Sequence, residues 1–266
     1  MKKLNLLLLF LSFVLLSCSK NELMNNDSIN NDSKVPQEHV LVSKTIETDA
    51  YTSNIITSNY SYEGNKLISI TRTGSNISKT LYTYTDDLIT KVEDFDSNEQ
   101  VLTTRTYSYN NGKLVKYTWH NTNNTYIYET DYTYISNETI NYTKSRTEIS
   151  TNSTGAMKTG TINMLNGNFM SDVSTHTPAY YEYDSKKQPF RNITGFNFLM
   201  FITTNKSGNQ NNATTINFPA TETTIATNKT YNYIYNSNDY PTEEKIYYSQ
   251  NNQSGDLLST IQYFYQ

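Results

Sequence analysis

Histidine, the commonest catalytic base and metal ligand, occurs at three widely separated positions, His39, His120 and His176. None of the three stands in a metal-ligand spacing such as His-x-x-x-His. The chain also contains neither a G-x-S-x-G nucleophile elbow nor a phosphate-binding loop. We therefore expect the histidines to be surface or rim residues, and we predict no metal site and no cofactor.

One acidic segment, Asp94-Phe95-Asp96-Ser97-Asn98, has the opening spacing of a calcium-binding loop. Its sixth position is Glu99 instead of glycine, and its twelfth is Arg105 instead of glutamate. A solvated hairpin tip explains these charges as well as a calcium site does. We therefore predict a hairpin tip here and no bound calcium.

Adjacent acids occur at Asp86-Asp87, Glu93-Asp94 and Glu243-Glu244. Paired carboxylates can serve glycoside hydrolysis, but none of these pairs lies in a recognisable motif. We predict a non-enzymatic binding or structural protein. The alternative is an enzyme or accessory subunit in extracellular glycan handling, which requires two or more carboxylates to converge in one concave pocket.

A row of aromatic residues suggests a binding surface. Tyr117, Trp119, Tyr126 and Tyr128 could form a sugar-stacking platform on one sheet face, because each ring has an apolar face and a polar edge. The competing interpretation is that they are ordinary core or cross-strand pairs. They are our candidate ligand-binding residues, and a glycan or an envelope protein is the partner expected.

The N-terminus has the features of an export signal. Met1-Lys2-Lys3 is positively charged, and Leu4 to Leu16 is an apolar stretch too short to span a membrane with flanks. The residues Leu15-Leu16-Ser17-Cys18 resemble the lipobox of bacterial lipoproteins, and Cys18 is the only cysteine in the chain. The resemblance implies that residues 1–17 are removed and that Cys18 is acylated. Several acyl chains together anchor a protein stably to a membrane.

The predicted lipoprotein has a clear domain organisation. Residues 18–38 comprise the lipidated cysteine and a polar, Asn-rich flexible tether, and residues 39–266 form the folded domain. Ser19 follows the cysteine where an inner-membrane retention rule would require Asp, which favours the outer membrane. The expected location is therefore the cell envelope, with the lipid on Cys18 as the contact with the membrane.

The composition points to a β-protein with a tyrosine-rich core. Mean hydropathy is only −0.66, but 24 tyrosines can each bury a large ring while keeping a polar tip. Removing Lys2 and Lys3 with the signal changes the net charge from −4 to about −6. No basic cluster is present, which argues against nucleic acid as a partner.

A repeated motif organises the domain. It consists of Tyr-x-Tyr, a short polar stretch and then an apolar pair, and its first four copies begin 22, 25 and 25 residues apart. Both rings of Tyr-x-Tyr lie on the same face of a strand. Residue pairs such as Asn111-Gly112 supply the positive φ of a tight turn. The copies are 60–68, 82–89, 107–115 and 132–140, with looser ones at 181–184, 233–236 and 263–265.

Each copy is therefore predicted to be a β-hairpin. A lone hairpin is marginally stable in water, so neighbouring hairpins must pair edge to edge. Residues 141–179, with turns at 153–155 and 166–167, fit longer hairpins of the same sheet. The expected fold is all-β, an extended twisted antiparallel sheet of tandem hairpins.

The segment 189–220 lacks the repeated motif and contains the densest apolar run of the mature chain. We predict a short non-repeat plug or helix that covers one end or face of the sheet. The alternative is an exposed apolar loop that contacts a partner or a membrane.

The motif Tyr-x-Tyr-Asp/Asn-x-x-Gly-x-Leu resembles the YD, or RHS-type, repeat. The whole layout is similar to the uncharacterised Bacteroidetes lipoproteins of the DUF4595 type, which include a segment like Tyr183-Asp184-Ser185-Lys186-Lys187-Gln188-Pro189-Phe190. The resemblance covers about residues 40–266 and implies a β architecture. It implies no particular chemistry.

Overall fold

The computed structural model describes residues 40–174, 178–199, 208–221, 224–250 and 255–266. Residues 39–266 form a unit of their own, separate from residues 1–38. The predicted signal, Cys18, the tether, His39 and His176 lie outside the described residues. Among the described residues no helix is long and apolar enough to cross a membrane.

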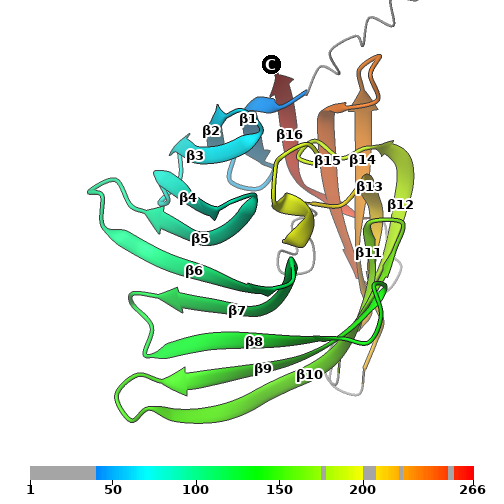
Figure 1. Cartoon of the computed structure of the whole chain (residues 1–266). Coiled ribbons are helices and arrows are strands. Elements are labelled where there is room, and N and C mark those ends of the chain that lie inside the picture. The colour runs from blue at the N-terminus through cyan, green and yellow to red at the C-terminus, as the bar shows by residue number, and fades with distance from the viewer. Residues whose placement is uncertain (1–39, 175–177, 200–207, 222–223, 251–254) are drawn as a thin grey trace, which may run out of the picture. The chain divides into compact units, whose positions relative to one another are not determined.

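Sixteen strands and one 3-10 helix make up the described fold (Figure 1). The elements are β1 (Val42–Asp49), β2 (Ile55–Glu63), β3 (Lys66–Thr73), β4 (Lys79–Thr85), β5 (Leu88–Phe95), β6 (Val101–Asn110), β7 (Lys113–Asn121), β8 (Tyr126–Tyr134), β9 (Thr139–Glu148), β10 (Ser153–Leu165), β11 (Asn168–Ser174), β12 (Ala179–Lys187), η1 (Phe196–Phe198), β13 (Asn211–Phe218), β14 (Thr227–Tyr235), β15 (Pro241–Gln250) and β16 (Asp256–Tyr265).

The strands form a closed antiparallel barrel in which each strand pairs with its neighbours in the chain and β1 pairs with β16. Leu41 and Gln266 exchange backbone hydrogen bonds at the seam. The all-β prediction is confirmed, but the predicted extended sheet is wrong. An open sheet would leave two edges of unpaired N–H and C=O groups, and closure of β1 on β16 pairs them.

The predicted hairpin turns are present. Asn111 and Gly112 have φ values of 48° and 73°, as a type I′ turn requires at both central residues. Gly64 (φ 57°) and Asp86 (φ 52°) begin the corresponding turns of the first two copies. The turn predicted at residues 153–155 is misplaced, because Ser153 already begins β10 and the turn lies just before it, where Asn152 has φ 54°.

Tyrosine side chains line the inside of the barrel. In β6, Tyr107 is buried whereas its neighbours Thr106 and Ser108 are exposed, so the strand alternates between an aromatic inner face and a polar outer face. Tyr107 and Tyr117 are direct cross-strand partners, and their ring centroids are 5.5 Å apart. The prediction that paired tyrosines share one side of the sheet is confirmed.

A β-bulge recurs just after the turn in the return strands of the repeats. In β3, Tyr62 pairs with Leu67 whereas Ser61 pairs with Ser69, so Ile68 is an extra residue. A bulge locally disrupts the hydrogen-bond ladder. The backbone of the residue before the bulge, here Leu67, forms a hydrogen bond with a tyrosine hydroxyl of the next strand, here Tyr84 of β4.

Within the described residues this contact occurs at seven strand pairs. The pairs are Tyr62 with Val42, Tyr84 with Leu67, Tyr109 with Ile89, Tyr134 with Leu114, Tyr183 with Phe169, Tyr233 with Ala213 and Tyr265 with Pro241. All seven partner residues are buried. The Tyr-x-Tyr motif therefore both fills the interior and, at these seven strand pairs, joins one hairpin to the one before it.

The segment between β12 and β13 enters the barrel, as the yellow ribbon in Figure 1 shows. Ile193, Phe196 and Leu199 are buried in the same core as the wall residues. Asn192 donates hydrogen bonds to the Val40 carbonyl and the Tyr240 hydroxyl, which ties the segment to one end of the barrel. The predicted plug is confirmed for the described residues, but its end is corrected because β13 already belongs to the wall.

We predict that Tyr109→Phe lowers stability without changing the fold. The variant removes the 2.8 Å hydrogen bond from the Tyr109 hydroxyl to the Ile89 carbonyl, and an unsatisfied buried carbonyl costs about 1–3 kcal/mol. For a domain of this size that corresponds to a Tm decrease of about 2–12 °C, measured by thermal circular dichroism. Tyr51→Phe, at an exposed turn position, is the matched control. Equal Tm values for the two variants would contradict the structural role of the hydroxyl.

Candidate functional site

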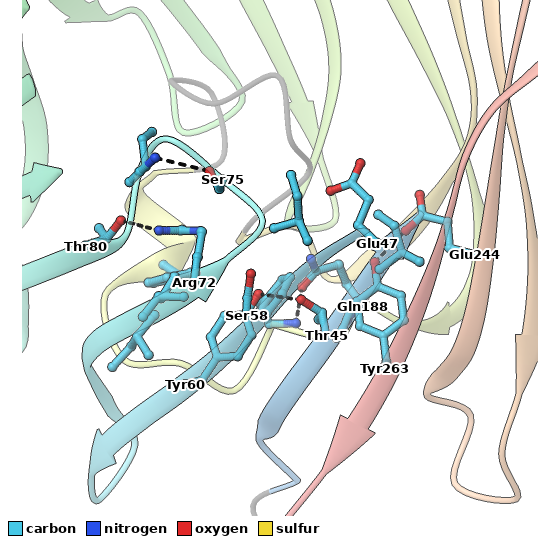
Figure 2. Close-up of a pocket in the computed structure, with 18 of the residues that line it drawn as sticks. Thr45, Glu47, Ser58, Tyr60, Arg72, Ser75, Thr80, Gln188, Glu244 and Tyr263 are labelled. Atoms are coloured by element: carbon cyan, nitrogen blue, oxygen red, sulfur yellow. Dashed lines mark hydrogen bonds between the residues drawn. The ribbon is translucent and has the colours of Figure 1, made fainter. Parts of the chain in front are cut away.

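A cavity of about 530 Å³ lies inside the barrel, between the inner wall and the plug (Figure 2). Strands from both sides of the seam contribute to its wall, and Gln188, Pro189, Phe190 and Phe196 of the plug segment contribute to its lining. The cavity combines aromatic rings with charged groups. Its aromatic and charged lining residues are Tyr60, Tyr82, Phe190, Phe196, Tyr231, Tyr233, Tyr263, Glu47, Arg72, Asp94, Arg105, Lys229 and Glu244.

A buried ion pair anchors one side of the cavity. Asp94 is only 6% exposed, and its carboxylate lies 2.5 Å from the Arg105 guanidinium. The same carboxylate accepts hydrogen bonds from the hydroxyls of Thr80 (2.7 Å) and Thr103 (2.6 Å). Arg72 donates to the Thr80 hydroxyl at 2.7 Å. A buried charge pair is stable only when such additional partners satisfy it.

The Arg105 side chain keeps one unused donor. Its Nε atom is buried and has no hydrogen-bond partner among the described residues. A buried donor without a partner costs free energy. The unpartnered Nε is therefore a local cost of burying the Asp94–Arg105 pair.

Two acidic residues, Glu47 and Glu244, lie on the other side of the cavity (Figure 2). Glu244 is 3% exposed and accepts a hydrogen bond from the Tyr263 hydroxyl at 2.5 Å. Burial raises the pKa of Glu47 above its usual value, a hydrogen bond to Ser259 partly offsets this, and the negative charge of Glu244 raises it further. The two carboxylates can thus accept hydrogen bonds from hydroxyl groups of a ligand.

The acidic pairs singled out in the sequence are divided between the two faces of the wall. Asp94 and Glu244 line the cavity, whereas their neighbours Glu93 and Glu243 lie on the opposite face of the same strands. Asp86 and Asp87 occupy a hairpin turn. Of these acids, Glu244 lies close enough to Glu47 for its charge to act on it, so two carboxylates share one side of the cavity, as the enzymatic alternative requires.

The calcium-like segment is partly a hairpin tip, as expected. Asp96 accepts backbone hydrogen bonds from Asn98 and Gln100 in the β5–β6 turn. Asp94 is not at the tip, because it points into the barrel and pairs with Arg105. Among the described residues no group of three or more His, Cys, Asp or Glu side chains is placed to hold a metal ion.

His120 lies on β7, between the inward-facing Trp119 and Asn121 of the same strand. Its cross-strand neighbours are Thr104 and Ile127, so it belongs to the outer face of the wall. It takes no part in the cavity.

The four predicted aromatic residues all lie on the inner wall, on β7 and β8, but they do not line the cavity. Tyr117 packs against the core with Tyr107. Trp119 and Tyr128 have ring centroids 5.1 Å apart, and Tyr126 and Tyr128 have centroids 6.4 Å apart. The structure brings Trp119, Tyr126 and Tyr128 together as a half-buried cluster and separates Tyr117 as a core residue.

No sequence motif marks Glu47, Arg72, Arg105 or Glu244 as cavity residues. A usable signal was nevertheless present, because the residue two positions before a Tyr-x-Tyr pair must face inward with the tyrosines. By that rule Ser58, Thr80, Arg105 and Thr130 face the lumen, and the cross-strand pairs confirm it.

Comparison with known proteins gives a fold likeness only. No protein-family model and no curated protein matches the sequence. A solved structure of a porin-like protein from Bacteroides uniformis is similar, with 15% identity, 85% of this chain and 98% of that chain covered, and a TM-score of 0.51. A porin-like protein from Bacteroides vulgatus has 12% identity, 85% and 99% coverage and a TM-score of 0.45. The resemblance to YD-repeat and DUF4595-type proteins is unconfirmed.

We predict that the barrel unfolds in alkali because its tyrosines are buried. Burial raises the pKa of Tyr82, Tyr117 and Tyr181 to about 12, whereas an unfolded tyrosine has a pKa of about 10. Their contribution to stability is complete below about pH 10 and is lost as the pH rises through about 12. Tm should therefore fall steeply in that interval, as measured by circular dichroism.

Tyrosinate absorbance, recorded in parallel, provides the check. The absorbance of the buried tyrosines should appear together with the loss of β-structure. A barrel whose tyrosines all ionise near pH 10 while its circular dichroism spectrum is unchanged would contradict the burial of these rings.

Proposed function

We propose that this protein is a non-enzymatic, lipid-anchored barrel of the bacterial envelope that binds a saccharide inside its lumen. The observation that carries the proposal is the cavity next to the plug, where aromatic rings and buried charged groups line the same space. Ligand sites characteristically combine apolar walls with a few placed polar groups.

The lining fits a saccharide better than a purely apolar ligand. Sugar rings present an apolar face that stacks on aromatic side chains and hydroxyls that need hydrogen-bond partners. Tyr60 and Phe190, whose ring centroids are 5.6 Å apart, offer the aromatic surface. Glu244 offers an acceptor for hydroxyls, and the cationic lining residues Arg72 and Lys229 offer donors.

The polar outer face of the barrel is suited to contact with water and not with lipid. A membrane-spanning barrel has an apolar outer band and a polar interior, whereas here the outward residues are mainly Thr, Ser, Asn and charged side chains. Outward-facing Lys116 on β7 lies 3.0 Å from Glu129 and 3.7 Å from Asp131 on β8. Charges on a lipid-facing wall would be costly, so we assign membrane attachment to the lipid on Cys18.

The location rests on three supports. The lipobox-like residues around Cys18 predict export and acylation. The polar outer wall suits a barrel held at a membrane without crossing it. The fold likeness to a porin-like protein from Bacteroides uniformis is in keeping with an envelope barrel.

We expect Glu244→Gln to reduce saccharide binding by about tenfold or more, because a hydrogen bond to a charged group contributes about 1.5–3 kcal/mol. The measurement is a glycan-array screen of the full-length protein in detergent, followed by calorimetry on the best glycan. Glu243→Gln changes the adjacent residue on the outer face and is the matched control. No binding of any glycan by the wild-type protein would refute the proposed function.

We expect Cys18→Ser to abolish incorporation of labelled palmitate and to move the protein from the membrane to the aqueous fraction. The physical reason is that the outer wall offers lipid no continuous apolar band, so the acyl chains supply the anchoring. Fractionation and labelling in the native host are the measurements. A variant that remains fully in the membrane, resistant to alkaline extraction, would contradict this proposal.

Glycan hydrolysis is the second candidate, and a specific observation favours it. Glu47 and Glu244 line the same cavity, and the negative charge of Glu244 acts on Glu47; two neighbouring carboxyl groups are what glycosidases use. Release of reducing ends from a bound glycan by the wild type, and its loss in Glu47→Gln, would favour this candidate over simple binding.

A further inference from the structure

A second group of residues on the inner wall combines aromatic rings with positive charge. We call it the rim patch, and its members are Trp119, Tyr126, Tyr128, Lys144, Arg146 and Lys158. Trp119 and Tyr126 flank the β7–β8 turn, so the patch begins at the end of the barrel away from the Tyr-x-Tyr turns. The four strands β7–β10 that carry it span about 14 Å across.

Strand register places these side chains on one continuous surface. Tyr128 is the direct partner of both Trp119 and Arg146. The Arg146 guanidinium lies 4.7 Å from the centroid of the Tyr126 ring. Lys144 and Lys158 are cross-strand partners, and their amines lie 5.6 Å and 5.8 Å from the Tyr142 ring centroid. Arginine and lysine are thus interleaved with rings along the wall.

The rim patch is open to solvent. Lys144 and Arg146 are exposed although they lie on the same strand face as the buried core residues Ile140 and Tyr142. Water therefore reaches this part of the inner wall. Trp119, Tyr126 and Tyr128 are half-buried, which leaves part of each side chain accessible.

The charges of the patch are only partly compensated. Like charges placed directly opposite each other destabilise a sheet, and Lys144 faces Lys158 in this way. Asp172 lies 3.6 Å from the Lys158 amine and also accepts a hydrogen bond from Tyr142. Glu148, on the same face, accepts a hydrogen bond from Thr151. Among the described residues, these three cations thus share two carboxylates on this face, which leaves the surface suited to an anion.

The patch adjoins the cavity. Trp119 is the cross-strand partner of Arg105, which lines the cavity and pairs with Asp94. A ligand longer than one sugar ring can therefore follow the inner wall from the cavity to the rim. Stacking would come from the rings, and charge recognition would come from Lys144 and Arg146.

We propose that the rim patch makes the lumen selective for anionic saccharides, with Trp119 and Tyr128 stacking on a sugar ring and Lys144 and Arg146 binding its carboxylate or sulfate. This inference rests on the proposed saccharide binding and adds the charge class of the ligand. Arginine matches a carboxylate or a sulfate through two parallel N–H donors.

The test compares three probes on the full-length protein in detergent by calorimetry. They are an oligogalacturonate, a sulfated heparin oligosaccharide and a neutral malto-oligosaccharide of equal length. We expect the wild type to bind at least one anionic probe ten or more times more tightly than the neutral one. Affinity for that probe should fall with added salt, and the two anionic arms distinguish carboxylate from sulfate.

The double variant Lys144→Gln with Arg146→Gln should abolish this preference. Its Tm should not fall appreciably, because the substitution relieves the repulsion between Lys144 and Lys158. The control, Lys91→Gln with Lys245→Gln, removes two charges from the outer wall and should leave the preference intact. Trp119→Ala should weaken binding of charged and neutral probes alike.

The outcomes separate the two proposals. Equal binding of anionic and neutral probes, or an unchanged preference in the Lys144 and Arg146 variant, would overturn the charge assignment while saccharide binding stands. Absence of binding by every probe, together with silence on the glycan array, would overturn both.

Discussion

The hydrogen bond from a tyrosine hydroxyl to the backbone beside a β-bulge is the contact on which the barrel depends. A bulge leaves the ladder incomplete, and a tyrosine from the next strand completes it, as Tyr109 does for Ile89. Because the ring must lie inside for its hydroxyl to reach this carbonyl, the same residue fixes the direction of the wall and fills its interior. Tyrosine is suited to this position because it buries a large apolar ring and still offers a polar tip.

This interaction also explains how a chain with low mean hydropathy can fold. Aliphatic residues such as Leu67, Ile89 and Leu114 are fully buried at the bulges, and tyrosines surround them. The polar half of the interior lies beyond this layer. There, the Asp94–Arg105 pair and Glu244 are held by threonine and tyrosine hydroxyls. The same repeated motif therefore provides both the apolar layer at the bulges and the polar part of the interior.

The sequence predicted the parts of the fold that local patterns determine. Tyr-x-Tyr spacing predicted the hairpins and their inner face, and Asn111-Gly112 predicted its turn. Closure of the barrel was missed because the seam joins residues 221 positions apart, Ser43 and Phe264, and no local pattern encodes such a pairing. Arg105 and Glu244 were missed as site residues for the same reason, since they converge only after closure. Trp119, Tyr126 and Tyr128 were singled out because aromatic residues are conspicuous in sequence, whereas Lys144 and Arg146 became relevant only through strand register.

The seam between β1 and β16 has a consequence for the order of events during folding. Its two strands lie far apart in sequence, as Leu41 and Gln266 do, yet they exchange backbone hydrogen bonds, so the ring of strands cannot close before both have formed. The hairpins between them can form locally, but the edge of β1 stays unpaired until β16 docks. A folding intermediate with all of its hairpins formed therefore still has two open edges at which another chain can pair, and slow closure of the seam exposes the protein to dimerisation or aggregation.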